Sequence, residues 1–596
     1  MKKIFYNISI LAVLTILFTS CSDFLEREPT DYSTTGFYKS EEAIRDGASG
    51  VYNLMYMDDL GGFGYNLPFT VYSDHFTPFA LERAENTTIG AGTLNPDLAA
   101  VSSLWNRLYI WIARANSVIE GSKDYIDGLS NRAKHYEAEV RVLRALAYYY
   151  LIATYGDVLF YTAPVTVDQY ADERTDRAVI LDFILEDLDF AAENLDWTAP
   201  NRGRVDKSVA YGLKARAALL GGSLNYGGKG ASYFEIAASA AQRVIGQRGL
   251  ANNYDDLFNL SGQAKADVRN ENLMEIMYSN VGGSVKNHVI GFGQISRNTG
   301  QTGRHPAMLL ADTYECIDGK RIDESPLYNP KYPQGNRDPR FHSTLWMHGD
   351  TVTVFNGALV TQVLSAYDNE TAFFNYGTGE WEMRPNFDVN VAAHAAAWAS
   401  FCNAGSGYIW AKFSNETTEN ISAQTCNVPV MRYAEILLSY AEAKIELNQL
   451  DQSVYGAINE VRARVGMPNV SADRIGNQQK MLQLVRRERK VEFALEGLFF
   501  VDMRRWGIGD LVNGQPSYGR PIDEVRYEGL SATDIPNFKK SDRHDLNDIA
   551  NYDAYKQKLT VRDLNRHWNN AYNLWPTPQI ERLRNPNLSQ NQGYTN

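Results

Sequence analysis

Cysteine is scarce in this sequence, and the three cysteines of the body are Cys316, Cys402 and Cys426, out of four in 596 residues. So small and odd a number does not build a disulfide framework, although a bridge between Cys402 and Cys426 stays open in an oxidising compartment. No Cys-x-x-Cys pair or Cys/His cluster has the spacing of a zinc site. We therefore expect no zinc site and assign no metal-binding residues, while a structural cation stays open.

The signatures of common enzymes are also missing. None of the nine histidines lies in an H-E-x-x-H spacing, and neither a G-x-S-x-G elbow nor a Walker loop occurs. A glycosidase needs two carboxylates across the scissile bond, but among 71 acidic residues such a pair can always be imagined. We predict a protein that is not an enzyme, with no catalytic residues and no cofactor.

Positive charge is in deficit, with 58 Lys and Arg against 71 Asp and Glu and a net charge of −13. This balance argues against binding of nucleic acid and against direct adhesion to an anionic membrane surface. Aromatic residues make up 12% of the chain, enough for both a helical core and an exposed binding platform. Composition alone does not separate these two uses.

Long hydrophobic runs are absent except at the N-terminus, where an apolar stretch over 4–18 follows Lys2 and Lys3. Its length suits a secretory signal better than a membrane span of about 20 residues, and a short anchor helix is the alternative. Thr19 and Ser20 before Cys21 resemble a bacterial lipobox, in which the cysteine is lipidated. We expect a signal peptide over 1–20, lipid attachment at Cys21 and a tether over 21–40.

Acidic residues follow this cysteine at once, in "CSDFLEREP". The stretch resembles the signal with which Bacteroidetes send lipoproteins to the outer face of the outer membrane. The alternative is a solvated tether whose charges only discourage packing. The first interpretation predicts a lipid-anchored protein of the outer membrane that is exposed at the cell surface.

Helical periodicity dominates most of the body, and Gly156 supplies a stop for the helix predicted in "RAKHYEAEVRVLRALAYYYLIATYGD". Trp105 and Trp111 fall on apolar helix faces and are predicted to be core. Paired helices with small residues at their crossings resemble tetratricopeptide units. The helical segments are "SEEAIRDGASGVYNLMY", "LWNRLYIWIARANSVIEG", "AVILDFILEDLDFAAENL", "KSVAYGLKARAALLGGSLNYG", "SYFEIAASAAQRVIG", "PVMRYAEILLSYAEAKIELNQ" and "SVYGAINEVRARVG".

The composition changes between about 251 and 428, where Gly, Asn, Pro and aromatic residues dominate and the helical periodicity fades. "TVTVFNGALVTQV" predicts short strands there. We expect a mainly α fold: one domain over 41–596, with a helical-hairpin scaffold over 41–250 and 429–596. Long irregular loops and a few short strands would form the ligand-binding face.

"RRERKVEFALEG" places Glu488, Glu492 and Glu496 four residues apart, a like-charged row that needs compensation. A buried or half-buried ion network is the prediction, and catalysis by ionised carboxylates is disfavoured. The expected partners are Arg486, Arg487, Arg489, Arg504 and Arg505. The terminal "LWPTPQIERLRNPNLSQNQGY" is predicted to be a non-helical tail that wraps the scaffold.

Several blocks together resemble the SusD/RagB family of outer-membrane nutrient-binding lipoproteins. They are the N-terminal "CSDFLEREP", "PVMRYAEILLSYAEAKIEL" with "AINEVRARVGMP", "RRERKVEFALEGLFFVDMRRWG" and the terminal "LWPTPQIERLRNPNLSQNQGY". The resemblance spans essentially the entire chain. One departure is Phe499, where members often carry a basic residue.

The resemblance implies capture of a poly- or oligosaccharide at the cell surface and its delivery to a SusC-like TonB-dependent transporter as partner. The same scaffold binding peptides or another nutrient is one alternative, and a surface glycoside hydrolase is a second. The sequence does not identify the sugar.

A sugar site needs exposed flat aromatic rings with amides or charged hydrogen-bond partners. In the family the site lies on irregular segments, and we take Trp346 and Trp381 as the best candidates because polar residues and glycine surround them. Trp506 and Trp575 lie in blocks that indicate scaffold and are excluded. The full candidate set is Tyr65, Phe76, Phe79, Arg83, Asn86, Asn95, Asn287, Phe292, Trp346, Trp381 and Trp398.

Replacement of the lipobox cysteine tests the anchor. We predict that Cys21→Ala abolishes lipidation and surface retention, because no other residue carries the acyl chains. Metabolic labelling with a fatty acid and fractionation of cells measure both. The purified variant should remain folded and bind ligand, and loss of binding would contradict the separation of anchor from scaffold.

Overall fold

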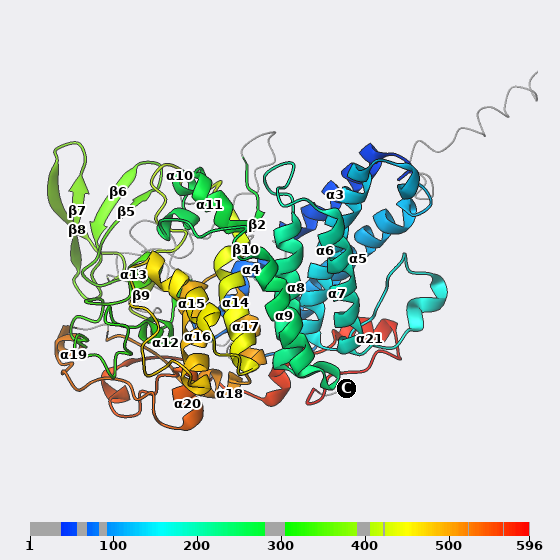
Figure 1. The fold of residues 1–596 in the computed structure, drawn as a ribbon. Coiled ribbons are helices and arrows are strands. Elements are labelled where there is room, and N and C mark those ends of the chain that lie inside the picture. The colour runs from blue at the N-terminus through cyan, green and yellow to red at the C-terminus, as the bar shows by residue number, and fades with distance from the viewer. Residues whose placement is uncertain are drawn as a thin grey trace, which may run out of the picture.

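A stack of helices forms one half of the protein (Figure 1). The computed structural model describes residues 37–56, 68–82, 92–279, 304–389, 406–420, 424–521, 524–563 and 566–594. Each long helix packs on the next one along the chain, which is the predicted hairpin arrangement. These helices are α3 (Glu41–Tyr52), α5 (Ala99–Ser122), α6 (Asn131–Tyr155), α7 (Arg177–Asn194), α8 (Lys207–Ser223) and α9 (Gly230–Val244).

Local sequence signals set the ends and spacing of these helices. Ser130 caps the start of α6 by accepting a hydrogen bond from the Arg132 amide at 3.2 Å. The predicted stop is confirmed, because Gly156 follows the last residue of α6 with φ of +77°. Helices α7 and α8 approach so closely at Gly221 that a Cβ there would collide with Leu181.

The stack continues after a long excursion of the chain. Helix α14 (Tyr433–Glu446) packs against α9 and α8, and α15 (Gln452–Arg464) and α16 (Gln478–Glu492) pack against α14. The shorter helices are α4 (Phe69–Tyr72), α10 (Leu260–Gln263), α11 (Ala266–Glu271), α12 (Met308–Thr313), α13 (Pro339–Thr344), α17 (Leu498–Arg505), α18 (Gly509–Asn513), α19 (Glu524–Glu528), α20 (Asp542–Asn547) and α21 (Gln579–Arg584).

Strands occupy the other half of the molecule in small antiparallel sheets, which confirms a mainly α fold with few strands (Figure 1). The largest sheet has the order β5-β6-β7-β8. Its first two strands match the predicted "TVTVFNGALVTQV". Its members are β5 (Thr351–Phe355), β6 (Leu359–Val363), β7 (Glu370–Asn375) and β8 (Glu380–Pro385). The pairs are β1 (Ala80–Glu82) with β3 (Arg304–Pro306), β2 (Asn272–Ile276) with β10 (Val428–Arg432), β4 (Leu345–Met347) with β9 (Tyr408–Trp410), and β11 (Ser517–Gly519) with β12 (Thr560–Asp563).

The three glutamates of the predicted row are all buried in an ion network, as expected, but not on one helix. Glu488 and Glu492 lie in α16, whereas Glu496 lies in the turn that follows, next to Leu495, whose φ is +62°. The break in the helix turns Glu496 toward different partners.

None of the arginines predicted as partners compensates these glutamates. Glu492 pairs with Arg340 at 3.1 Å, Arg432 at 3.0 Å and Arg464. Arg340 also pairs with Glu488 at 2.9 Å, and Arg432 pairs with Glu496 at 2.7 Å. The further partners are Arg462 for Glu488, Lys412 for Glu496 and Glu271 for Arg432.

The predicted partners serve other acids close to the same helix. Arg487 pairs with Glu315 and Asp548, and both Arg489 and Arg505 pair with Asp502. The mismatch arises because the true partners come from α13, β10, α15 and the segment after β9, up to 152 positions away. Local spacing carries no information about such distant pairs.

The charges of this network hold its acids ionised, as predicted. Burial alone would raise the pKa of Glu492, but Arg464, Arg432 and Arg340 outweigh it and hold the pKa well below its usual range. The pKa values of Glu488 and Glu496 are lowered against burial in the same way. Carboxylates held ionised are poorly suited to act as general acids.

The C-terminal tail wraps the helical stack as predicted, although it contains the short helix α21. The amide of Trp575 donates to the Thr154 carbonyl at 2.6 Å, and the Asn591 side chain donates to the Tyr155 carbonyl at 2.8 Å. Trp575 and Trp506 are buried, in keeping with their exclusion from the candidate set.

Removal of one arginine tests how much the network stabilises the fold. We expect Arg432→Met to lower the free energy of unfolding by about 3–5 kcal/mol, because buried Glu492, Glu496 and Glu271 lose a shared partner. Urea unfolding measures the change. Arg384→Met is the control, because its pair with Glu382 is exposed and such pairs contribute about 1 kcal/mol or less. Equal effects of the two substitutions would contradict this role.

Candidate ligand-binding surfaces

Seven predicted site residues fall outside the described residues, and five fall within them. The seven are Cys21, Tyr65, Arg83, Asn86, Asn287, Phe292 and Trp398. Cys402 also lies outside the described residues, so its pairing with buried Cys426 stays a prediction.

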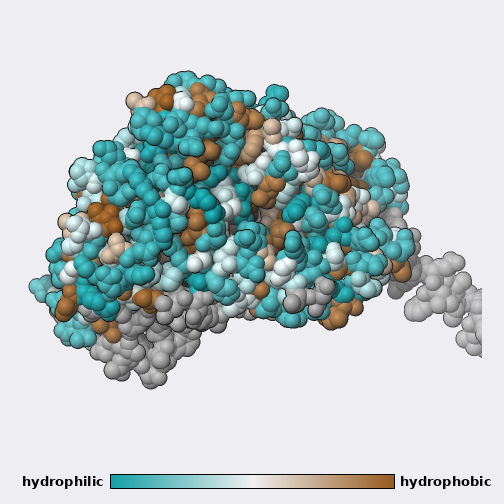
Figure 2. Space-filling model, turned by 90° about the horizontal axis from the view of Figure 1, so that it is seen from below, coloured by the Kyte–Doolittle hydropathy of each residue, from teal (hydrophilic) through white to brown (hydrophobic). Residues whose placement is uncertain are grey.

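On the face in Figure 2, hydrophobic residues lie scattered among hydrophilic ones. Exposed ring clusters and cavities, rather than one large apolar patch, are therefore the candidate binding features.

Phe76 and Phe79 are corrected from ligand contacts to core residues. Each is only 2% exposed. Phe79 stacks on Phe499 with ring centroids 3.9 Å apart, and Phe76 packs against Trp575 at 5.4 Å. Phe76 ends a short helical segment and Phe79 lies in the turn before β1, and both rings pack into the core.

Asn95 is exposed, but its carboxamide serves a local turn. Its Oδ1 accepts from the Asp97 amide at 3.0 Å, and its Nδ2 donates to the Thr93 carbonyl at 3.0 Å. Trp346, on β4, is half-buried and packs beneath the four-stranded sheet against Val352 and Val354. It therefore contributes to the support of the sheet.

Trp381 lies on the solvent-facing side of that sheet and is 50% exposed. It stands directly opposite Phe374 on β7, with ring centroids 5.6 Å apart, and Tyr376 packs on Phe374 at 5.1 Å. Tyr376 is 52% exposed, and Met383 is exposed on the same side as Trp381. We call Phe374, Tyr376, Trp381 and Met383 the outer sheet face.

Hydroxyl groups border these rings. The Tyr376 hydroxyl is 2.7 Å from Thr361 Oγ1, which is 2.7 Å from Thr353 Oγ1. The opposite side of the sheet is covered, since Val352, Val354 and Phe373 are buried. A strip of edge-to-face rings with hydroxyls beside it suits a ligand that has apolar faces and polar edges.

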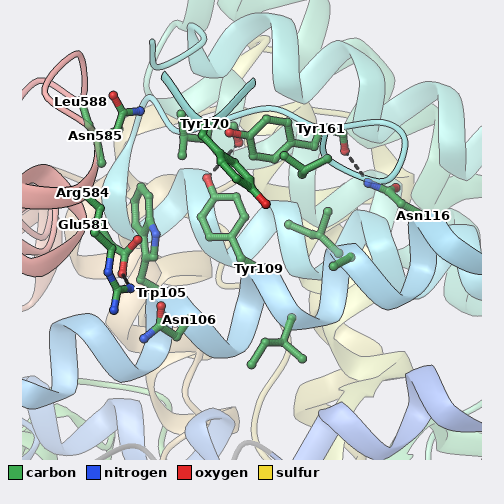
Figure 3. Close-up of a pocket in the computed structure, with 15 residues that line it drawn as sticks. Trp105, Asn106, Tyr109, Asn116, Tyr161, Tyr170, Glu581, Arg584, Asn585 and Leu588 are labelled. Carbon is green, nitrogen blue, oxygen red and sulfur yellow. Dashed lines mark hydrogen bonds and ion pairs between the residues drawn. The ribbon is translucent and has the colours of Figure 1, made fainter. Parts of the chain in front are cut away.

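A second candidate is a cavity of about 630 Å³ between α5, the segment 159–171 and the tail (Figure 3). Its volume lies within the range of small-molecule sites, about 300–1,000 Å³. We call it the tail groove. Its lining comprises Trp105, Asn106, Tyr109, Ile110, Ile112, Ala113, Asn116, Leu159, Tyr161, Val165, Tyr170, Glu581, Arg584, Asn585 and Leu588.

Aromatic rings from α5 and the segment 159–171 meet in this groove. Trp105 and Tyr109, one helical turn apart, have ring centroids 4.9 Å apart, and Tyr161 lies 6.3 Å from Tyr109. Trp105 is buried as predicted, whereas Tyr170 is 66% exposed. Figure 3 shows Asn106, Glu581 and Arg584 toward one end of this set and Tyr161 and Asn116 toward the other.

Buried polar side chains hold the segment 159–171 from beneath. Asn116 donates to the carbonyls of Tyr161 at 2.8 Å and Ala163 at 3.2 Å. Arg144 donates to the Thr162 carbonyl at 3.1 Å, and the Tyr148 hydroxyl donates to that of Tyr161 at 2.7 Å. The Tyr109 hydroxyl donates to the Leu159 carbonyl at 2.8 Å, and burial raises the pKa of this tyrosine, so it stays protonated.

The tail holds the same segment from its other side. Asn585 donates to the Asp172 carbonyl at 2.8 Å, and Asn587 donates to the Ala171 carbonyl at 2.8 Å. Glu581 and Arg584 of the tail pair at 2.8 Å. The sequence did not reveal the groove because its lining comes from segments more than 400 residues apart. The one local signal was Tyr170, an aromatic residue in the long connection between α6 and α7.

Two kinds of feature are absent from the residues that the structure describes. No group of three or more His, Cys, Asp or Glu is placed to hold a metal ion. None of the helices in these ranges is long and apolar enough to cross a membrane.

Comparison with known proteins gave consistent results. The model of the SusD family matches residues 267–594, and a model described as starch-binding associating with outer membrane matches residues 23–219. SusD-like protein P25 of Formosa agariphila is 25% identical over 523 residues, covering 84% of this chain and 90% of that protein. A SusD-like protein of Bacteroides ovatus is 28% identical over 272 residues, covering 43% and 48%.

Solved structures share the fold. A SusD-like carbohydrate-binding protein from Bacteroides fragilis has a TM-score of 0.70 at 24% identity, covering 93% of this chain and 100% of the other. A laminarin-binding SusD-like protein has a TM-score of 0.58 at 20% identity, covering 94% and 100%.

The support beneath the segment 159–171 is testable. We expect Asn116→Ala to speed amide hydrogen exchange in 159–165 about tenfold, because two carbonyls lose a buried donor, at a cost of about 1.4 kcal/mol. Exchange detected by mass spectrometry measures it. Asn106→Ala is the control, since Asn106 lies on the same helix and lines the same groove but is exposed. Unchanged exchange in Asn116→Ala would contradict the assigned support.

Proposed function

The chain belongs to the SusD family, and from this premise we propose that it is a cell-surface glycan-binding lipoprotein. It captures a poly- or oligosaccharide and delivers it to a TonB-dependent transporter of the outer membrane. One matching family is described as starch-binding associating with outer membrane, and one structural relative is named as a carbohydrate-binding protein. Both descriptions support this role. Peptide or other nutrient binding on the same scaffold is the runner-up.

The exposed aromatic strip of the outer sheet face is the observation that carries the proposal. Trp381 and Tyr376 are about half exposed to solvent, although burying them would favour folding. A pyranose ring stacks its C–H face on such rings, and its hydroxyls reach the threonine and tyrosine hydroxyls beside them. Each contact is reversible, as release to a transporter requires.

Capture needs no bond breaking, and the carboxylate next to Trp381 in β8, which lies on the opposite side of the strand, does not supply a general acid. Glu382 on β8 pairs with Arg384, and that pair lowers the pKa of the carboxyl. An ionised carboxylate beside an arginine is a poor general acid, which glycoside hydrolysis needs. Binding is therefore better supported than hydrolysis.

Anchoring fits the same role. A lipid on Cys21 contributes about 0.8 kcal/mol per buried methylene, so multiple acyl chains hold a water-exposed domain at the membrane without a spanning helix. Residues 21–40 then serve as the tether between the anchor and the domain. We propose that this attachment leaves the domain able to open and close over the transporter.

Substitution of the tryptophan of the strip tests the proposal. We expect Trp381→Ala to weaken binding of the preferred glycan at least tenfold, equivalent to about 1.4 kcal/mol, through loss of stacking. Isothermal titration against a panel that includes laminarin and soluble starch measures it. Tyr332→Ala is the control, because this exposed tyrosine lies outside both candidate surfaces. Wild-type binding of a peptide mixture but of no glycan would favour the runner-up.

A further inference from the structure

We propose that the tail groove is a second carbohydrate-binding site, separate from the outer sheet face. Its ligand is a chain of pyranose rings with apolar C–H faces on both sides, as in a β-1,4-glucan. This inference rests on the proposed function, because it assumes a glycan ligand. It adds a second site and the kind of sugar ring that the site accepts.

The segment 159–171 is held more firmly than folding requires. None of the residues of its short helix, Val167–Ala171, is buried, and Val167 is 79% exposed. This helix therefore adds almost nothing to the core. Yet Asn116, Arg144 and Tyr148 fix the backbone before it, and the tail fixes the backbone at its end.

Ordering a segment costs about 1–2 kcal/mol per residue, and buried polar side chains must also be desolvated. The result is an exposed tyrosine ring, Tyr170, in a fixed position at the edge of a cavity. Exposed side chains on a rigidly positioned loop are typical of binding sites. Binding gives this arrangement a use that stability alone does not.

The chemistry of the lining indicates the ligand. Tyr170 comes from the segment 159–171, Tyr109 and Ile110 come from α5, and Leu588 comes from the tail, so an entering ring meets apolar groups on more than one side. Polar groups lie toward one end of the groove (Figure 3). They are the Asn106 amide and the Glu581–Arg584 ion pair. Apolar walls with a polar end fit sugar rings, whose faces are C–H and whose edges are hydroxyl.

The same lining favours sugars whose hydroxyls all lie at the ring edge. In glucose-configured rings these hydroxyls are equatorial, so both faces present C–H groups. An axial hydroxyl, as at C2 of mannose, points from one face and would be pressed against an apolar wall without a partner. An unpaired buried hydroxyl costs about 1–3 kcal/mol, enough to discriminate between the two sugars.

The two sites share no element of the structure. The outer sheet face lies on β7 and β8 at one end of the molecule, whereas α5 and α21 lie toward the opposite end (Figure 1). A long polysaccharide that reaches both sites is held at two points, which raises its effective affinity without any new contact. Short fragments that fill only one site gain nothing from the second.

Hydrogen exchange and titration of the detergent-solubilised full-length protein test the inference. We expect cellohexaose to slow amide exchange in 159–171 in the wild type and in Trp381→Ala, but not in Tyr170→Ala. In the Trp381→Ala background, Tyr170→Ala should weaken cellohexaose binding at least fivefold. Val167→Ala is the matched control, because Val167 lies on the same exposed helix outside the cavity lining.

β-1,4-Mannohexaose has the same linkage and length as cellohexaose but carries axial hydroxyls, and we expect it to give no protection in 159–171. Equal protection by both would overturn the assigned ring class. Cellohexaose binding without protection in 159–171, and unaffected by Tyr170→Ala, would overturn the second site while leaving the proposed function intact. Failure of the wild type to bind any glycan would overturn the proposed function itself.

Discussion

The buried charges around Glu492 join parts of the chain that lie far apart in the sequence. Arg340 from α13 and Lys412 from the segment after β9 belong to the loop-rich half, while Arg464 ends a scaffold helix. Each buried charge depends on the others, because a lone buried ion costs several kcal/mol. The irregular half is thus tied to the helices through the end of α16.

Both candidate surfaces depend on backbone that is fixed by such distant contacts. The outer sheet face stands on Trp346 and the buried valines beneath it, and the tail groove stands on Asn116 and Arg144. In each case exposed rings project from a support that makes its own hydrogen bonds or core contacts. Preformed sites bind without the cost of ordering loops, and they also release their ligand without unfolding.

Periodic features could be predicted from the sequence, and pairings could not. The helix stop at Gly156, the strands in "TVTVFNGALVTQV" and the burial of Trp575 follow from local pattern. The partners of Glu492 lie up to 152 positions away, and the lining of the tail groove joins segments more than 400 positions apart. Local spacing does not encode either arrangement. Phe76 and Phe79 were misassigned because a place on an irregular segment does not determine the direction in which a ring points.

The central claim is that this protein holds a glycan without breaking it. Affinity electrophoresis of the full-length protein through gels with embedded polysaccharides tests it most directly, followed by size analysis of the recovered glycan. We predict that at least one polysaccharide retards the protein and that its chain length is unchanged. Migration unaffected by every polysaccharide, or recovery of shortened chains, would contradict the account.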